Sequence, residues 1–70
     1  MSNEILIRWG GSIRARRLEL GLTVDAIAAA VEVDRSNVVR WEAGKTEPNL
    51  THRVALSSAL DIPAKDLFDY

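Results

Sequence analysis

Two short helical segments that meet at a tight corner, within residues 21–45, constrain the fold of this chain more than any other feature. Apolar residues recur at helical spacing on both sides of the corner, which falls at Glu32 and Val33. Ala28 is small enough to let the two helices cross closely there. Gly44 suits the left-handed conformation that ends many helices, and it is placed to end the second segment. The sequence therefore predicts a helix, a turn and a second short helix.

The same helical periodicity runs through the rest of the chain, and no segment alternates as a β-strand does. A first helix is expected over residues 4–20, a fourth over Leu50–Leu60, and a short fifth one from Pro63, which suits the first position of a helix. Because 70 residues without a linker allow only one domain, we predict an all-α, five-helix bundle over residues 1–70. The residues expected to line its core are Ile5, Trp9, Ile13, Leu20, Ile27, Ala28, Val31, Val38, Trp41, Leu50, Val54, Leu56, Leu67 and Phe68.

Small and polar residues mark the ends of these helices. Gly21 is placed to end the first helix, Thr23 to cap the start of the second, and Asp34 to cap the start of the third. Inside the first helix, Gly10 and Gly11 leave two alternatives open. They either loosen the start of the helix, at about 1 kcal/mol each relative to alanine, or let another backbone approach closely.

Composition argues against several classes of function. The chain has no cysteine, which excludes disulfides and thiolate metal sites. His52 is the only histidine, and no pattern suggests a nucleophile with its base or a phosphate-cradling glycine loop. We therefore expect no metal, no cofactor, no small-molecule substrate and no enzyme activity. No apolar run reaches membrane-spanning length and no signal pattern is present, so we expect a cytoplasmic protein with no membrane partner.

The net charge of −1 is unusual for a nucleic-acid binder, which as a rule carries a basic surface. The charges are unevenly distributed, however. The last ten residues hold three aspartates and one lysine, whereas most of the cations precede them: Arg8, Arg14, Arg16, Arg17, Arg35, Arg40 and Lys45. A protein with separated charges can present one basic face to phosphates. We expect modest non-specific affinity from such a face.

Four segments of the chain together form a family pattern. They are IRARRLELGLT (13–23), AIA (26–28), VDRSNVVRWEAGKTEP (33–48) and ALDIPAKDLF (59–68). In order and spacing they resemble the Cro-like and lambda-repressor-like helix-turn-helix domains of phage and bacterial regulators. The resemblance implies a five-helix bundle in which the second and third helices form the helix-turn-helix. It also implies that the protein binds double-stranded operator DNA, expected to be palindromic, as a homodimer.

Position by position, the resemblance makes the third helix the recognition helix. The residues placed where the family contacts bases are Arg35, Ser36, Asn37 and Arg40. The residues expected at the sugar-phosphate backbone are Arg14, Arg17, Thr23, Lys45, Thr46 and Asn49. Arg17 and Glu42 also match a partly buried salt bridge that joins the first helix to the third in this family.

Three positions depart from the family pattern. Val24 replaces a polar residue at the start of the second helix, which removes a side-chain phosphate contact but leaves the backbone N–H groups of the helix start. Glu32 stands at the corner in place of glycine, so it has to accept a positive φ, at about 1 kcal/mol, or bend the corner differently. Asp61 replaces glycine at the end of the fourth helix, and aspartate tolerates a left-handed conformation better than most residues.

Arg35 and Arg40 are the strongest candidates for sequence recognition, because an arginine fork donates two hydrogen bonds to guanine O6 and N7. The alternative is that they are solvated or contact only phosphates. Ser36 either contacts a base or caps its own helix. Trp41 is expected in the core rather than as a stacking platform for bases. Arg16 is left open between a phosphate contact and a solvated position.

Two functions from different classes fit these observations. The first is a sequence-specific transcriptional regulator, a repressor of phage or bacterial type that pairs through the fifth helix and the tail residues Leu67, Phe68 and Tyr70. Two-fold pairing would set the recognition helices about 34 Å apart, one turn of DNA. The second is a protein-interaction module on the same scaffold, such as an antitoxin or co-regulator, which the negative net charge favours. The fold alone does not choose between them.

Overall fold

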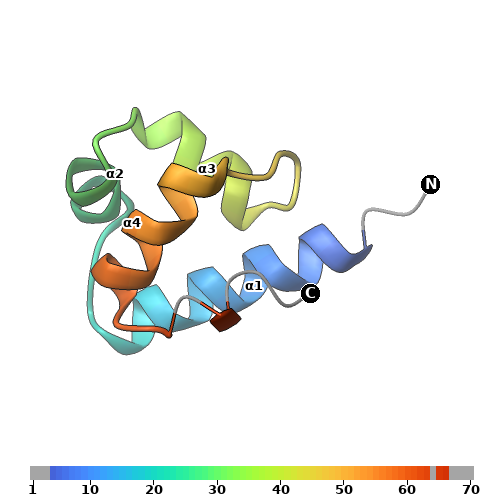
Figure 1. Ribbon diagram of the computed structural model, residues 1–70, viewed down its shortest axis with the longest axis horizontal. Helices are drawn as coiled ribbons and strands as arrows, with labels where there is room; N and C mark the ends of the chain where they lie inside the picture. The colour runs from blue at the N-terminus through green and yellow to red at the C-terminus, as the bar shows by residue number, and fades with distance from the viewer. Residues whose placement is uncertain (1–3, 64, 67–70) are drawn as a thin grey trace.

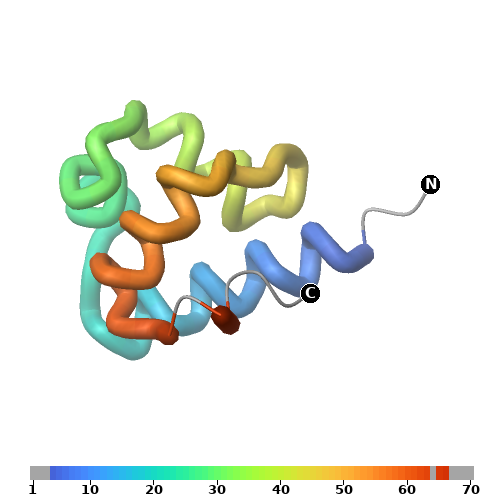
Figure 2. The backbone as a smooth tube through the Cα atoms, in the orientation of Figure 1, coloured from blue at the N-terminus to red at the C-terminus, as the bar shows by residue number. Residues whose placement is uncertain are grey.

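Four helices make up the described part of the chain, which comprises residues 4–63, 65 and 66 of this computed structural model. In chain order they are α1 (Glu4–Glu19), α2 (Val24–Val31), α3 (Arg35–Glu42) and α4 (Leu50–Leu60). Figure 1 shows α1 running along one side of the molecule, with α2 and α3 meeting at a corner on the other side and α4 crossing between them. Figure 2 shows that the C-terminal end of α4 lies beside the C-terminal end of α1.

The all-α class predicted from the periodicity is confirmed, but the number of helices is four in the described residues rather than five. After α4, Asp66 N donates to Pro63 O at 2.9 Å and closes one helical turn. Residues 65 and 66 are helical, and the remaining positions of the predicted fifth helix lie outside the described residues. Leu67, Phe68 and Tyr70, which were assigned to the fifth helix and tail, lie outside the described residues. No helix within residues 4–63 is long and apolar enough to cross a bilayer.

The core lies where the four helices face one another, and each of them contributes to it. Its buried apolar side chains are Trp9, Ile13, Ile27, Ala28, Val31, Val38, Trp41, Leu56 and Leu60. All of these except Leu60 were predicted from the helical periodicity. Because Val38 and Trp41 point inward, the opposite side of α3 is left to solvent.

Four residues predicted for the core are exposed instead. Leu50 is 68% and Val54 is 51% exposed, because the buried side of α4 is the one that carries Leu56. Ile5 is 52% exposed, since the first turn of α1 extends past the other three helices (Figure 1). Leu20 is 39% exposed and lies in the turn that follows α1. The periodicity identified apolar stripes, but it did not show which of them another helix covers.

All four described helices end in the same backbone motif, in which one residue adopts a left-handed conformation. After α1 and α3 that residue is a glycine, Gly21 (φ 69°) or Gly44 (φ 73°). After α2 and α4 it is Glu32 (φ 64°) or Asp61 (φ 54°). The N–H groups just beyond each helix bond back to its last carbonyl groups. Of the two alternatives left open at the corner, Glu32 therefore accepts the positive φ, and the turn between α2 and α3 stays tight.

Gly10 lies inside α1 at the point where this helix touches the end of α3. A Cβ atom on Gly10 would lie 2.7 Å from Glu42 O and would also collide with Trp41 O. The neighbouring Gly11 faces open space. Of the two roles left open by the sequence, close backbone packing is the one that fits Gly10. The missing side chain lets the backbones of α1 and α3 approach each other.

The two glycines of α1 provide a matched test of this contact. Gly10→Ala should push α1 away from α3 and lower the free energy of unfolding by about 1–3 kcal/mol. Gly11→Ala should raise it by about 0.5–1 kcal/mol, because alanine is the better helix former and nothing obstructs its methyl group. Urea unfolding followed by tryptophan fluorescence measures both changes. Equal effects of the two substitutions would contradict the proposed contact.

Candidate nucleic-acid interface

A buried ion pair between Arg17 of α1 and Glu42 of α3 joins these two helices. Arg17 Nε lies 2.7 Å from Glu42 Oε2 and Arg17 Nη2 lies 3.0 Å from Glu42 Oε1, so both carboxylate oxygens are held. The two side chains are 9% and 7% exposed. Arg17 Nη1 also donates to Leu22 O at 2.9 Å, in the segment that leads into α2. The pair expected from the resemblance is therefore present, and it connects three parts of the chain.

The surroundings of Arg17 indicate that this residue has a structural role. Hydrogen bonding to Glu42 raises the pKa of Arg17, and this effect and the attraction of the Glu42 charge outweigh burial, which acts in the opposite direction. The guanidinium therefore stays charged inside the protein. Each of its three nitrogens already donates a hydrogen bond, and the residue is 7% exposed. The structure thus gives Arg17 a buried, scaffold role, and its predicted contact with the sugar-phosphate backbone stays a prediction.

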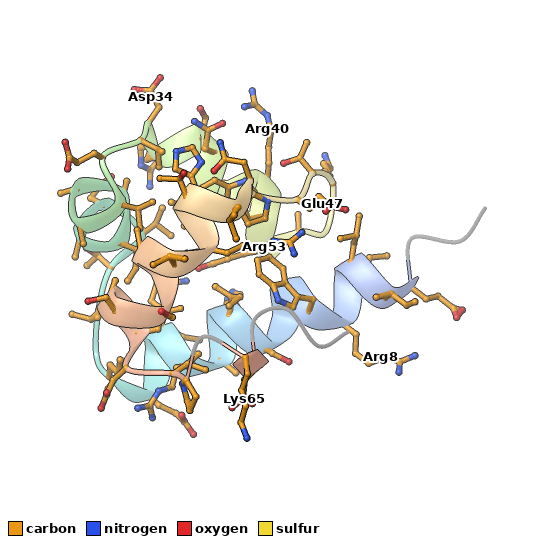
Figure 3. All side chains as sticks on the ribbon, viewed as in Figure 1. Arg8, Asp34, Arg40, Glu47, Arg53 and Lys65 are labelled. Atoms are coloured by element: carbon orange, nitrogen blue, oxygen red, sulfur yellow. The ribbon has the colours of Figure 1, made fainter. Side chains whose placement is uncertain are left out.

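The side of α3 that faces solvent carries polar and basic residues. Arg35, Ser36 and Arg40 are exposed, and Val39, which is 45% exposed, lies among them on the same side of the helix. Asn37 is half-buried and lies at the edge of this side. Figure 3 shows Arg40 projecting away from the body of the molecule. We call Arg35, Ser36, Val39 and Arg40 the outer face of α3.

Both arginines of the outer face contact a neighbouring side chain and remain accessible. Arg35 Nε donates to Asp25 Oδ1 of α2 at 2.8 Å, and the two side chains are 65% and 73% exposed. Arg40 Nη1 donates to Asn37 Oδ1 at 3.4 Å on the surface of α3. Neither arginine is buried, so both retain N–H groups that can bond to another molecule.

The starts of α2 and α3 are built differently. Thr23 caps α2 as expected, because its Oγ1 accepts a hydrogen bond from Ala26 N at 3.0 Å. Asp34 is the N-cap residue of α3 as predicted, but its carboxylate accepts no hydrogen bond from the helix. The backbone carbonyl of Asp34 accepts from Asn37 N at 3.0 Å instead, and the carboxylate points into solvent (Figure 3). Val24, the departure at the start of α2, packs partly against the core.

The loop between α3 and α4 is anchored at both of its ends. Lys45 N donates to Arg40 O at 3.0 Å, which completes the motif that ends α3. At the other end, Asn49 Oδ1 caps α4 by accepting from His52 N at 2.8 Å. Lys45 and Thr46 are exposed in this loop. Asn49 thus has a structural role in addition to the backbone contact predicted for it.

Arg14, Arg16 and Arg53 also lie outside α3. Arg16 Nε donates to Leu60 O at 2.9 Å and so holds the end of α4 against α1, which makes Arg16 part of the scaffold. Arg53 Nε donates to Pro48 O at 3.1 Å and fixes the loop before α4. Arg14 is exposed on α1, a different helix from the one that carries the outer face. Its predicted backbone contact stays a prediction.

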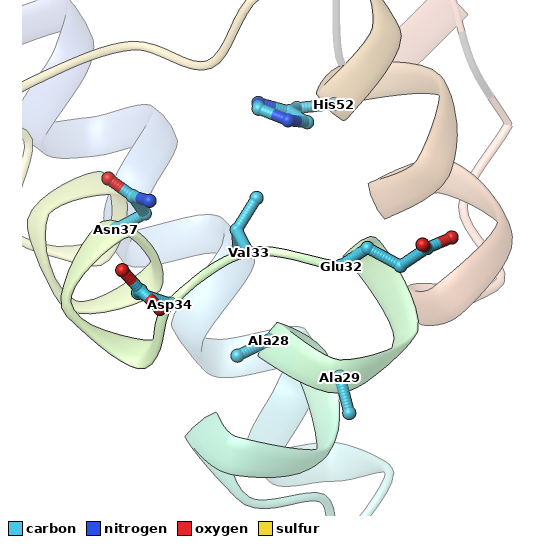
Figure 4. A pocket seen from close by; sticks show the side chains of 7 residues that line it. All are labelled: Ala28, Ala29, Glu32, Val33, Asp34, Asn37 and His52. Atoms are coloured by element: carbon cyan, nitrogen blue, oxygen red, sulfur yellow. The ribbon is translucent and has the colours of Figure 1, made fainter.

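An open hollow lies beside the start of α3. Figure 4 shows Asn37 and His52 facing each other across it. The His52 ring lies 5.5 Å from the ring of Trp41, which is 4% exposed, so Trp41 belongs to the core rather than to a stacking platform. Within the described residues no group of three acidic or histidine side chains is placed to hold a metal ion. The residues that line the hollow are Ala28, Ala29, Glu32, Val33, Asp34, Asn37 and His52.

Two residues of this surface were not identified as site residues from the sequence. Val39 follows Val38 on α3, and the structure buries Val38 (0% exposed) while Val39 is 45% exposed. Asp25 reaches Arg35 because of the angle at which α2 and α3 meet. This angle depends on how the two helices pack, and a local sequence pattern does not predict it.

A family model described as helix-turn-helix matches residues 13–67. The chain belongs to the helix-turn-helix family. In this helix-turn-helix protein, α2 and α3 meet at the tight corner within the matched residues, and the outer face belongs to the second of these helices. A comparison with curated protein sequences found no match.

Solved structures share the lambda-repressor-like fold of this helix-turn-helix protein. The restriction-modification controller protein C.AhdI from Aeromonas hydrophila is 32% identical over 93% of this chain and 98% of that chain, with a TM-score of 0.86. The P22 c2 repressor, crystallised with synthetic operator 9T, is 37% identical over 84% of this chain and 89% of that chain, with a TM-score of 0.80. The clp gene regulator ClgR from C. glutamicum is 22% identical over 89% and 80% of the two chains, with a TM-score of 0.77, and shares the fold.

A double-mutant cycle tests the buried pair. Glu42→Leu alone should lower the free energy of unfolding by about 3–5 kcal/mol, because it leaves the Arg17 charge buried without its partner. The double variant Arg17→Met, Glu42→Leu should lose much less, since apolar side chains of similar volume leave no charge uncompensated. Chemical denaturation of the wild type, both single variants and the double variant gives the coupling energy. Additive losses would show that the two side chains act independently.

Proposed function

We propose that this protein is a sequence-specific transcriptional regulator that binds double-stranded DNA by placing α3 in the major groove. The outer face of α3 carries this proposal: it is exposed and basic, while the opposite side of the same short helix is locked into the core. A helix presented in this way fits the width of the major groove of B-DNA. Membership of the helix-turn-helix family and the likeness to the operator-bound P22 c2 repressor support the same function.

The base contacts come from the outer face and its edge. Arg35 and Arg40 each offer paired N–H groups, which match O6 and N7 of guanine. The hydroxyl of Ser36 can bond to any base, and the methyl groups of Val39 suit the methyl group of thymine. Asn37 lies at the edge and bonds to Arg40, so it acts both on the DNA and on the direction of Arg40.

The contacts to the sugar-phosphate backbone come from segments that flank α3. The N–H groups at the start of α2 form a site for a phosphate, since the helix dipole favours negative charge there. The side chains that contribute are those of Arg14, Thr23, Lys45, Thr46 and Asn49. Four arginines of the described chain are already paired with carboxylates, namely Arg16, Arg17, Arg35 and Arg53. Few cations are left for phosphates, so non-specific affinity should be modest.

We further propose that the protein binds a palindromic operator as a homodimer and acts as a repressor in the cytoplasm. Two-fold pairing would place the two α3 helices about 34 Å apart, in successive major grooves on one side of the DNA. A neighbour that is named a repressor and one that is named a controller protein, both matched over most of their length, support a regulatory role. The segment proposed to pair, with Leu67, Phe68 and Tyr70, lies outside the described residues.

A protein-interaction module is the second candidate. Asp25, Glu32 and Asp34 are exposed around the corner of α2 and α3, and the net charge is −1. Carboxylates in this position repel phosphates and would suit a basic surface on another protein. Selection of bound sites from random duplex DNA separates the two functions. A palindromic motif that contains guanine supports the regulator, and the absence of any enriched motif contradicts it.

Two substitutions test the assignment of residues within the regulator. Arg40→Ala should weaken binding to the selected duplex by about 1–3 kcal/mol and relax the preference at one position of each half-site. Lys45→Ala should weaken binding to all sequences alike and reduce the salt slope by about one per subunit. Fluorescence anisotropy at several salt concentrations measures both effects. If Arg40→Ala leaves affinity and preference unchanged, Arg40 is not a base reader and the interaction module gains support.

A further inference from the structure

Asp25 and Arg35 form a bond between the first turn of α2 and the first turn of α3. Arg35 Nε donates to Asp25 Oδ1 at 2.8 Å, although the two side chains are 65% and 73% exposed. An exposed ion pair adds little to the stability of a fold, because water screens it and two long side chains lose freedom. The corner between α2 and α3 is already held by the motif at Glu32 and by buried apolar residues. The pair is therefore available for a role other than stability.

The atoms used in this bond determine what Arg35 can do next. A guanidinium carries five N–H donors, one on Nε and two on each terminal nitrogen. It can meet the edge of a guanine either end-on, with both terminal nitrogens, or side-on, with Nε and one terminal nitrogen. Asp25 occupies Nε and therefore blocks the side-on approach. The two terminal nitrogens stay open for an end-on pair with O6 and N7 of guanine.

We propose that Asp25 is a positioning residue for Arg35 and that it determines the guanine selectivity of Arg35 at one operator position. The inference rests on the proposed function, because it requires α3 to contact bases. The carboxylate acts in two ways. It holds the guanidinium in one orientation, so that less side-chain freedom is lost when the base is bound. It also places a negative charge near the DNA, which weakens binding to every sequence through repulsion of phosphates.

These two effects act in opposite directions on affinity, and only the orientation of Arg35 changes selectivity. Repulsion between Asp25 and phosphates is independent of sequence, and so it lowers non-specific and specific binding alike. The orientation of Arg35 helps only where a guanine accepts both hydrogen bonds. In the groove, where water is partly excluded, the bond between Asp25 and Arg35 becomes stronger than in solution. Asp25 therefore lowers the affinity for DNA in general and raises the discrimination between bases.

The start of α3 offers a matched control. Asp34 is also an exposed carboxylate near the outer face, but Arg35 bonds to Asp25 and not to Asp34. Asp34→Ala should raise non-specific affinity in the same way as Asp25→Ala, because each removes one negative charge. Only Asp25→Ala should change the preference for guanine. Asp25→Glu keeps a carboxylate at this position and should therefore keep part of that preference.

The experiment uses the full chain and the duplex selected from random DNA, together with duplexes in which each base of the motif is replaced in turn. Asp25→Ala should reduce the discrimination in favour of guanine at one position by about five- to tenfold. That position should be the one at which Arg35→Ala also abolishes discrimination. In the Arg35→Ala background, Asp25→Ala should have no further effect there. Thermal unfolding of Asp25→Ala should stay within about 4 °C of the wild type, because the pair is exposed.

Three outcomes would overturn the inference, and they can be told apart. Unchanged discrimination in Asp25→Ala, with a wild type that does select a motif, would refute the role of Asp25 and leave the proposed function standing. An equal loss in the wild-type and Arg35→Ala backgrounds would show that Asp25 does not act through Arg35. A wild type that prefers no duplex sequence would refute the proposed function and, with it, this inference.

Discussion

The ion pair between Arg17 and Glu42 determines where α3 lies, and the geometry of the outer face depends on it. A charge left buried without its partner costs several kcal/mol, so neither residue can leave the contact alone. Gly10 lets the backbones of α1 and α3 approach closely, and Glu42 then lies 2.7 Å from the guanidinium. The same guanidinium holds Leu22 O, ahead of α2. The buried guanidinium of Arg17 thus fixes α2 and α3 relative to α1. This arrangement determines the direction in which the outer face points.

On the surface formed by α2 and α3, the groups that could attract any DNA differ from the groups that could distinguish one base from another. Arg16, Arg35 and Arg53 are each paired with a carboxylate of the same chain, so we expect net charge to contribute little to the attraction for DNA. What remains accessible is a short row of donors on one side of α3, held in place by Asp25 at one end and by Asn37 at the other. A protein built this way would bind random DNA weakly and depend on base contacts for its affinity. A net charge of −1 is therefore compatible with membership of the helix-turn-helix family.

Local patterns in the sequence were enough for the four described helices, the corner and most of the core, but not for the number of helices. Thr23 as a cap, Gly21 and Gly44 as helix ends, and the inward side of α3 all follow from spacing and from backbone preferences. The exposure of Leu50 and Val54 did not follow, because periodicity shows that residues share a side but not what covers it. The bond between Asp25 and Arg35 did not follow either, since it depends on how two helices meet. Asp34 has the right residue type for a cap, but its backbone carbonyl bonds to the helix and its carboxylate does not.

If the outer face of α3 enters the groove, the buried pair behind it should stay closed. The N–H resonances of the arginine Nε atoms test this directly, because each arginine reports on its own surroundings. On titration with the selected duplex, the signals of Arg35 and Arg40 should shift strongly, and that of Arg17 should stay where it is. Shifts confined to Arg8 and Arg14 on α1, with Arg35 and Arg40 unmoved, would contradict the claim and place the DNA on another surface.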